Sequence, residues 1–289
     1  MRKKLIILFI LAGIIAILSL HIYNEIRPKR YAVFAGFNAK GKIADYVISY
    51  IKGLNEVSDG VVYIADSSIY PEELEKIKNI TIHTEHQRHE EYDWGSYKRG
   101  FNWLKDNGYL KKADELIFAN DSCYAPMTSF KPMFEKMSQN KDIDFWCNTQ
   151  NIAFKPHIQS YFMVFRKPVI NSKKFASFIN NVTHQINNAG YIANYEIQLP
   201  SYLANFGYKW DTYIPYQELS HLKEPDNNSY PLTLIRDYNN QFLKRRTFTT
   251  HLTILEDRHE LLKYIHQNYP TRYQEIKKEI NPKFIPTGL

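Results

Sequence analysis

Two kinds of hydrophobic pattern alternate along residues 31–125. Short apolar runs bounded by turn-forming residues are typical of buried strands, and apolar residues spaced three or four positions apart are typical of amphipathic helices. The predicted strands are Tyr31–Gly36, Val61–Ala65, Ile80–His83 and Leu116–Ala119. The predicted helices between them are Ile43–Leu54, Pro71–Asn79 and Ser96–Asn107. This alternation predicts an α/β fold with a mostly parallel sheet flanked by helices.

The pattern is less regular after Pro126. Asp144–Thr149 and Ser160–Phe165 read as strands that could pair with each other. The predicted helices are Phe130–Met137, Phe175–Ile186, Tyr195–Phe206 and a tail over Glu256–Ile280 that breaks at Pro270. The chain shows no internal repeat and no composition shift after residue 31. We therefore expect residues 31–289 to form a single domain with a helical C-terminal tail.

The first thirty residues have a different character. Leu5–Ile22 is an apolar stretch of eighteen residues, which is near the shortest length that spans a bilayer as a helix. It has no small-residue cleavage site, so residues 1–30 are predicted to be an uncleaved single-pass membrane anchor and linker. Three basic residues precede the stretch and three follow it, so the flanking charge does not set its orientation.

Composition narrows the classes of partner. The net charge of +7 is spread along the chain without a basic run, which argues against nucleic-acid binding and suits an anionic membrane surface or a nucleoside diphosphate. Two cysteines without a C-x-x-C spacing imply neither a disulfide framework nor a zinc site. The 22 tyrosines suit either sugar or base stacking or an aromatic core.

Acidic residues follow two of the predicted strands. Asp66 follows Val61–Ala65, and Asn120, Asp121 and Ser122 follow Leu116–Ala119. In open α/β sheets, ligands bind outside the carboxyl ends of the strands. One carboxylate could accept hydrogen bonds from a base or ribose, while the other helps to hold a divalent cation on a diphosphate. Asp66 as a turn or helix-cap residue is an equal alternative.

Further candidates come from three other segments. Gly95, Ser96 and Lys98 begin a helix whose free N–H groups could bind an anion, although Asp93 beside them could be a plain cap. Glu196 could deprotonate an acceptor hydroxyl, or simply favour a helix start through the helix dipole. Lys244 lies in a basic cluster that could touch phosphate, or that could be an exposed helix face.

Five motifs occur in an order that resembles a known family. They are Tyr92–Gly100, Ile117–Pro126, Asp144–Trp146, His157–Phe162 and Tyr195–Ile197. Together they resemble the rhamnan synthesis F family of bacterial polysaccharide glycosyltransferases, over residues 31–250. The resemblance implies a GT-A-like fold and an enzyme of the hexosyltransferase type. Such an enzyme transfers a sugar, often rhamnose, from a nucleotide-sugar donor to a cell-surface polysaccharide or lipopolysaccharide acceptor.

The resemblance also implies roles for single residues. Asp121 takes the place of the Asp-x-Asp metal motif, Asp66 that of the base-binding aspartate, and Glu196 that of the catalytic base. Because Asn120–Ser122 holds one carboxylate rather than two, the need for Mg²⁺ or Mn²⁺ stays open. The implied partners are the donor, a glycan or lipid-linked acceptor and the membrane. Because activated sugar nucleotides are cytosolic, we expect a cytosolic domain. The alternatives are a degenerate, non-catalytic scaffold protein that binds glycan and an exported hydrolase.

Overall fold

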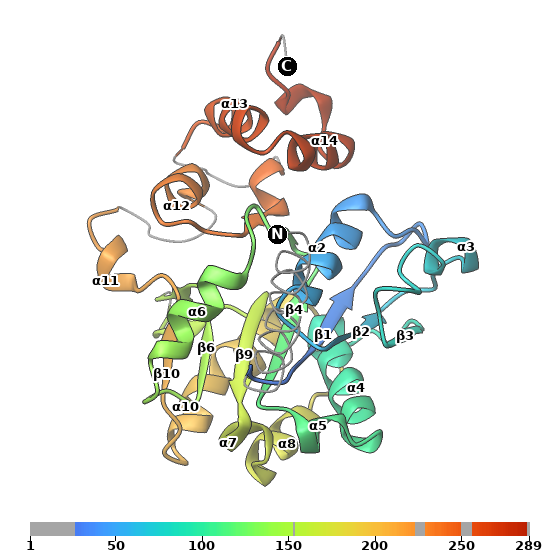
Figure 1. The fold of residues 1–289 in the computed structure, drawn as a ribbon, viewed down its shortest axis with the longest axis vertical. Helices are drawn as coiled ribbons and strands as arrows, with labels where there is room; N and C mark the ends of the chain where they lie inside the picture. The colour runs from blue at the N-terminus through green and yellow to red at the C-terminus, as the bar shows by residue number, and fades with distance from the viewer. Residues whose placement is uncertain (1–26, 153, 223–228, 250–255, 288–289) are drawn as a thin grey trace, which may run out of the picture.

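A computed structural model describes residues 27–152, 154–222, 229–249 and 256–287. In these ranges seven strands form one sheet in the order β10-β6-β9-β4-β1-β2-β3 (Figure 1). The strands β1 to β4 and the pair β6 and β10 run parallel to their partners, while β9 runs antiparallel between β4 and β6. The bounds are Arg30–Gly36 for β1, Gly60–Ala65 for β2, His83–His86 for β3, Glu115–Asn120 for β4, Phe145–Cys147 for β6, Phe162–Arg166 for β9 and Trp210–Thr212 for β10. The sheet is mostly parallel, as the sequence predicts.

The two faces of the sheet carry separate cores. Along β1, Ala32 and Phe34 belong to one apolar cluster, while Tyr31, Val33 and Ala35 belong to the other. This alternation follows from the period of two in a strand. The first face is covered by α2 (Asp45–Asn55), α6 (Lys131–Gln139) and the C-terminal helices. The second is covered by α4 (Tyr92–Asp106), α8 (Lys173–Asn180) and α10 (Gln198–Ala204).

Short elements complete the described parts of the chain. The helices are α3 (Pro71–Leu74), α5 (Tyr109–Lys112), α7 (Lys167–Ile170), α9 (Asn188–Tyr191), α11 (Tyr216–Leu219), α12 (Pro231–Asp237), the π-helix η1 (Ile192–Glu196) and the 3₁₀-helices η2 (Arg245–Phe248) and η3 (Pro282–Phe284). Two small ladders pair β5 (Cys123–Tyr124) with β11 (Leu243–Lys244) and β7 (Gln150–Asn151) with β8 (His157–Ile158).

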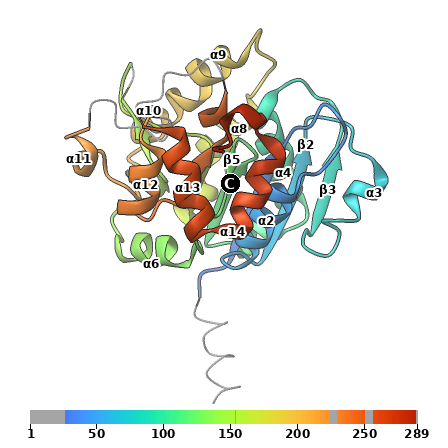
Figure 2. The ribbon, with the colours of Figure 1, turned by 90° about the horizontal axis from the view of Figure 1, so that it is seen from above.

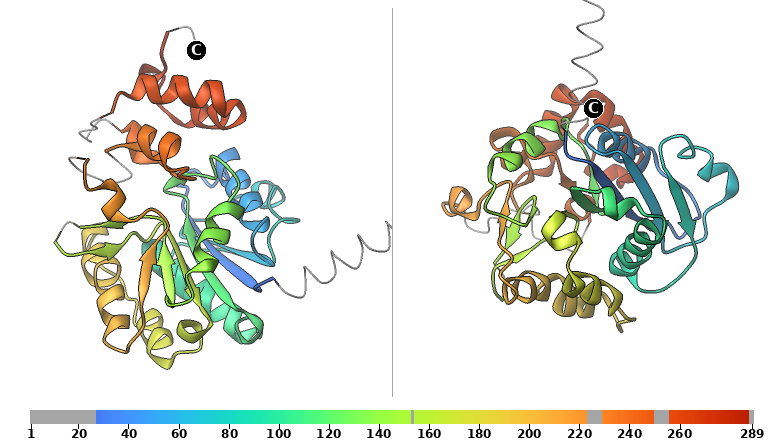
Figure 3. Two further views of the ribbon diagram at one scale, coloured as in Figure 1. Left: turned by 60° about the vertical axis from the view of Figure 1, so that its left-hand side comes forward. Right: turned by 60° about the horizontal axis from the view of Figure 1, so that its bottom comes forward.

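The predicted C-terminal tail forms two helices that meet at Pro270. These are α13 (Arg258–Asn268) and α14 (Pro270–Glu279), which are stacked on α12 at one end of the molecule (Figures 1 and 3). Seen from that end, they cross the middle of the domain (Figure 2). Ser49 on α2 donates a hydrogen bond to Glu275 at 2.6 Å, and Lys278 pairs with Asp45. These contacts hold α14 against α2.

Several predicted elements differ from the observed ones. The strand predicted at Ile80–His83 lies at His83–His86, because the Ile80 N–H and the Thr81 hydroxyl both bond to the Ile77 carbonyl and hold a turn. The helix predicted over Phe175–Ile186 ends at Asn180, since Thr183 donates its N–H to the Tyr195 hydroxyl and Ile186 is 99% exposed.

Three helices begin or end at other residues than predicted. The first, predicted at Ser96, begins at Tyr92, so Asp93 already lies in its first turn. The second, predicted at Tyr195–Phe206, is divided between η1 and α10. The third, predicted over Pro71–Asn79, is helical over Pro71–Leu74.

The predicted membrane anchor, Leu5–Ile22, lies outside the described residues. Among the residues that are described, no helix is both long enough and apolar enough to cross a bilayer.

Candidate active site

A cavity of about 600 Å³ opens beyond the carboxyl end of β4. Its walls come from the start of α4, the residues after β4, the β7–β8 region, η1, the β11–η2 segment and the residues after α14. Parallel sheets commonly bind ligands at this edge. The cavity brings together Asn120, Asp121, Ser122, Glu196 and Lys244 from the set of predicted site residues.

Asp121 lies at the base of this cavity, where β4 ends. Its N–H donates to the Ala35 carbonyl at 3.1 Å, and one carboxylate oxygen accepts the N–H of Phe37 at 2.9 Å. The Asp121 carbonyl accepts bonds from the Tyr46 hydroxyl and from Arg245, each at 3.2 Å. Burial raises the pKa of Asp121, although the nearby Arg245 lowers it in part. The backbone contacts hold this carboxylate in one position.

Asn120, the residue before Asp121, is hydrogen-bonded to a second carboxylate of the site, that of Asp93. The side-chain oxygen Oδ1 of Asn120 accepts bonds from the Ser122 N–H at 3.1 Å and from the Ser122 hydroxyl at 2.5 Å, which orients the side-chain amide. Its NH₂ group donates to Asp93 at 2.6 Å. Desolvation, followed by the charge of Asp121, raises the pKa of Asp93 from 3.8 to about 7. The sequence also allows Asp93 to be a cap, but the N-cap residue of α4 is Glu91, and the Asp93 carboxylate bonds to Asn120 instead.

Glu196 faces the cavity from η1. One of its oxygens accepts both the N–H of Ser160, at 3.0 Å, and the Ser160 hydroxyl. The other oxygen lies 3.9 Å from Nε2 of His157, which also lines the cavity. The Glu196 side chain is 15% exposed, so a substrate hydroxyl could reach it.

Three consecutive cations also line the cavity and form what we call the cationic wall: Lys244, Arg245 and Arg246. The pairing of Lys244 with Cys123 and the bond from the Arg245 N–H to the Ser122 carbonyl bring this wall beside Asp121. The Lys244 amine lies 3.6 Å from the centre of the Tyr161 ring. The segment is a strand followed by a 3₁₀-helix, not the exposed helix face of the alternative interpretation.

Asp66 is not brought into this cavity. Its carboxylate accepts the N–H groups of His89 at 2.7 Å, Glu90 at 2.8 Å and Tyr92 at 3.2 Å, and it pairs with Arg88 at 2.8 Å. Glu90 and Tyr92 have φ values of 60° and 52°, in the left-handed region that non-glycine residues rarely adopt. Asp66 therefore holds a strained loop, residues 88–92, in place.

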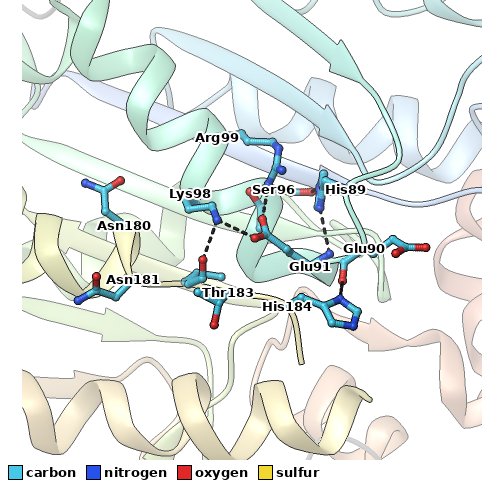
Figure 4. Close-up of polar contacts among 12 residues, drawn as sticks. His89, Glu90, Glu91, Ser96, Lys98, Arg99, Asn180, Asn181, Thr183 and His184 are labelled. Carbon is cyan, nitrogen blue, oxygen red and sulfur yellow. Dashed lines mark hydrogen bonds and ion pairs between the residues drawn. The ribbon is translucent and has the colours of Figure 1, made fainter. Parts of the chain in front are cut away.

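Ser96 and Lys98 face this loop (Figure 4), and neither they nor Gly95 line the cavity. Lys98 donates to Glu91 at 2.8 Å and to the Val182 carbonyl at 2.7 Å, and Ser96 lies 3.0 Å from Nε2 of His89. A Cβ atom at Gly95 would lie 2.2 Å from the Cβ of Glu91. Glu91 neutralises the positive charge that suggested an anion site, a contact that the sequence pattern does not reveal.

The side chains around Asp121 limit how a metal ion could bind. Within the described ranges, no three His, Cys, Asp or Glu side chains are grouped closely enough to hold one. Magnesium is often held by one or two carboxylates together with substrate phosphates. Asp121 therefore fits a cation shared with a bound diphosphate, and the described residues do not build a site from protein ligands alone.

Two solved structures that resemble the chain are only distantly similar to it. A cytidylyltransferase from Leptospira borgpetersenii has 13% identity and a TM-score of 0.44, over 91% of this chain and 99% of its own. The mannosyltransferase PcManGT from Pyrobaculum calidifontis, in complex with GDP-Man and Mn²⁺, has 10% identity and a TM-score of 0.39, over 65% of this chain and 55% of its own. TM-scores this low establish neither a shared activity nor a shared ligand.

Sequence comparison is more informative. No curated protein matches the chain. The family model described as rhamnan synthesis protein F matches residues 61–280, which is more than half of the chain. This match confirms the resemblance indicated by the five motifs, and with it the expected class of enzyme, a glycosyltransferase. The chain belongs to the rhamnan synthesis protein F family.

Proposed function

We propose that this protein transfers a sugar from a nucleoside-diphosphate donor to a hydroxyl of a cell-surface polysaccharide or lipopolysaccharide, in a GT-A-like domain. We further propose rhamnose as the sugar. The observation that carries the proposal is the cavity itself, which is lined both by three consecutive cations and by Asp93, Asp121 and Glu196. The cations suit a diphosphate, and the carboxylates suit sugar hydroxyls and proton transfer.

The donor diphosphate would bind along the cationic wall. Lys244 and Arg245 would offset its charge and stabilise the charge that develops on the leaving diphosphate. Asn120 and Ser122 would keep the floor of the site rigid beneath it. A divalent cation held by Asp121 and the phosphate oxygens would supply further positive charge there.

The donor nucleoside would extend toward the carboxyl ends of β1 and β3. Phe37, which is 47% exposed, follows β1, and the Arg88 guanidinium lies 5.4 Å from the centre of its ring. Asp66 fixes Arg88 through the ion pair and the Arg88 bond to the Asp66 carbonyl. In this proposal Asp66 contributes to donor binding indirectly, by holding the loop, with Gly95, Ser96 and Lys98 as its support.

The acceptor would enter on the side of η1. Glu196, oriented by Ser160, would accept a hydrogen bond from an acceptor or sugar hydroxyl, and the exposed ring of Tyr92, which also lines the cavity, would pack on a sugar ring. An anchor at Leu5–Ile22 would confine the domain to the membrane that carries the acceptor and raise its effective concentration. We propose that the domain faces the cytosol.

Release of nucleoside diphosphate from a panel of nucleotide sugars, including a rhamnose donor, tests the proposal on the full-length chain. The assay is run with Mg²⁺, with Mn²⁺ and with a chelator. We expect one donor class to turn over, and Arg245→Ala to raise its KM about tenfold. Lys111→Ala, an exposed lysine on α5, is the matched control.

The outcome separates two functions. A failure of every donor to bind would overturn the proposal. Donor binding without turnover would instead favour a non-catalytic scaffold, an alternative supported by the single carboxylate at residues 120–122.

A further inference from the structure

Asp93 reaches the cavity because of how its loop is held. The left-handed Tyr92 precedes it, and the Tyr92 N–H is bound by Asp66. Asp93 lies in the first turn of α4, yet its side chain does not cap the helix. It lines the cavity between Tyr92 and Trp94. This carboxylate is therefore available to a ligand.

The hydrogen bonds around Asp93 leave one oxygen open. Asn120 is oriented by Ser122, so its NH₂ group must point toward Asp93. In the described parts of the chain, this amide is the one side chain that hydrogen-bonds to Asp93. Glu196 differs, because Ser160 already donates two bonds to one of its oxygens. Asp93 is thus the less satisfied of the two carboxylates.

Charged and titratable groups surround Asp93 on three other elements and on its own helix, α4. Asp121 approaches from the end of β4, Glu196 from η1 and Lys244 from β11, while Tyr97 lies on the same helix. Burial and the two carboxylates favour the protonated form, and Lys244 and Asn120 oppose them. A proton acceptor that titrates near neutral pH is well matched to general base catalysis.

We propose that Asp93 is the catalytic base of the transfer, accepting the proton of the acceptor hydroxyl on the oxygen that Asn120 leaves open. The inference rests on the proposed function and reassigns the role that the sequence suggests for Glu196. The acceptor oxygen forms a bond to the anomeric carbon as its proton passes to Asp93. The bond from the anomeric carbon to the diphosphate oxygen breaks, and its electron pair leaves with the nucleoside diphosphate.

The pH dependence of kcat for the donor that turns over tests this role. Wild-type kcat should rise about tenfold for each pH unit below about 7, because the base must be ionised. Asp93→Asn should lower kcat by about 10²- to 10⁴-fold and remove this rise. Glu196→Gln should keep it, and so should Asp106→Asn, a control at the exposed end of α4.

Binding of the free nucleoside diphosphate shows whether the variant is still folded. In wild type, ionisation of Asp93 should weaken this binding as the pH rises through about 7, since both partners are negative. Asp93→Asn should bind at least as tightly and lose the part of that dependence that comes from Asp93, keeping the part from the terminal phosphate, which itself titrates near about pH 6. If Asp93→Asn keeps the wild-type pH profile in both measurements, the inference is wrong even if transfer occurs. If wild type turns over no donor, the proposed function fails first.

Discussion

Two carboxylates beside the same central strand have opposite surroundings. Asp66 follows β2 and Asp121 follows β4, and both strands pair with β1. Asp66 accepts three backbone N–H groups and pairs with Arg88. The Asp121 carboxylate accepts one N–H from another residue, Phe37, and shares its cavity with Asp93 and Glu196. A carboxylate whose hydrogen bonds are all made within the protein stabilises the fold. A carboxylate that can still accept further hydrogen bonds can act on a ligand.

The two regions are nevertheless linked. We call Asp66, residues 88–92, Lys98 and Arg99 the loop anchor. The loop anchor fixes the left-handed backbone of Tyr92, and Asp93 follows directly. Strained conformations persist when the surrounding structure over-determines them, and they cluster at functional sites. The loop anchor, whose polar groups are hydrogen-bonded within the protein, thus determines the position of Asp93 in the cavity.

The largest effect is expected from Asp66→Ala. Three N–H groups of the loop would lose their acceptor, at about 1–3 kcal/mol for each buried group. We expect the free energy of unfolding to fall by about 5 kcal/mol, measured by urea denaturation at pH 7. Asp142→Ala, at an exposed position, should change it by less than about 0.5 kcal/mol. A loss below about 1 kcal/mol for Asp66→Ala would mean that the loop does not depend on this anchor.

Asp93→Asn is expected to raise the free energy of unfolding, whereas Asp66→Ala lowers it. A rise in the pKa of Asp93 from 3.8 to about 7 corresponds to about 4 kcal/mol, which water in the cavity would reduce to about 3 kcal/mol. Because the folded-state pKa is the higher one, this stability is present below about pH 4 and is lost as the pH rises through about 7. The variant should therefore be the more stable protein at pH 8.

Urea unfolding of wild type and Asp93→Asn at several pH values measures the difference. The advantage of the variant should shrink steadily from about pH 7 to pH 4. An equal or lower stability of the variant at pH 8 would contradict the unfavourable surroundings of Asp93. Ionisation of Asp93 would then not destabilise the folded protein, contrary to its raised pKa.

The contrast between the regions also shows what the sequence could predict. The apolar pattern located β1, β2 and β4 almost to the residue, and therefore Asp121 at a strand end. The pattern could not show that Glu91 neutralises Lys98, because this contact depends on the left-handed backbone of Glu90 and Tyr92 on either side of Glu91. It also could not distinguish Asp93 from a cap, since the burial and the charge of Asp121 that perturb it come from tertiary structure.

The same limit applies to the second half of the domain. The pairing of Asp144–Thr149 with Ser160–Phe165 is confirmed in β6 and β9, because their apolar residues face both cores. The helix predicted to Ile186 is too long. Its apolar spacing continues past Asn180, but the backbone turns toward Tyr195 and leaves Ile186 in solvent. Side-chain to backbone bonds between distant segments override local periodicity there.

A smaller effect, again in the loop anchor, is expected from Glu91→Gln. Burial alone would raise the pKa of Glu91, but bonds from Arg99 and Lys98 lower it overall. The variant removes the charge that both cations share, although Lys98 keeps its bond to the Val182 carbonyl and Arg99 keeps its longer ion pair with Glu85. We expect the free energy of unfolding to fall by about 2 kcal/mol at pH 7. Because the folded-state pKa is depressed, the deficit should diminish as the pH falls through that pKa, opposite to the trend for Asp93. A deficit that is constant between about pH 7 and pH 3 would contradict this assignment.

The smallest effect is expected from Arg246→Ala, in the cationic wall. Arg246 is exposed and lines the cavity, and no side chain in the described ranges neutralises it in the way that Glu91 neutralises Arg99. Its loss should weaken nucleoside diphosphate binding about fivefold without lowering stability, as calorimetry at low salt can measure. The difference should shrink at about 0.5 M salt, where exposed charges are screened, and Lys111→Ala should not reproduce it. Unchanged affinity would restrict the diphosphate to Lys244 and Arg245, whereas lost stability would place Arg246 with the loop anchor's structural charges.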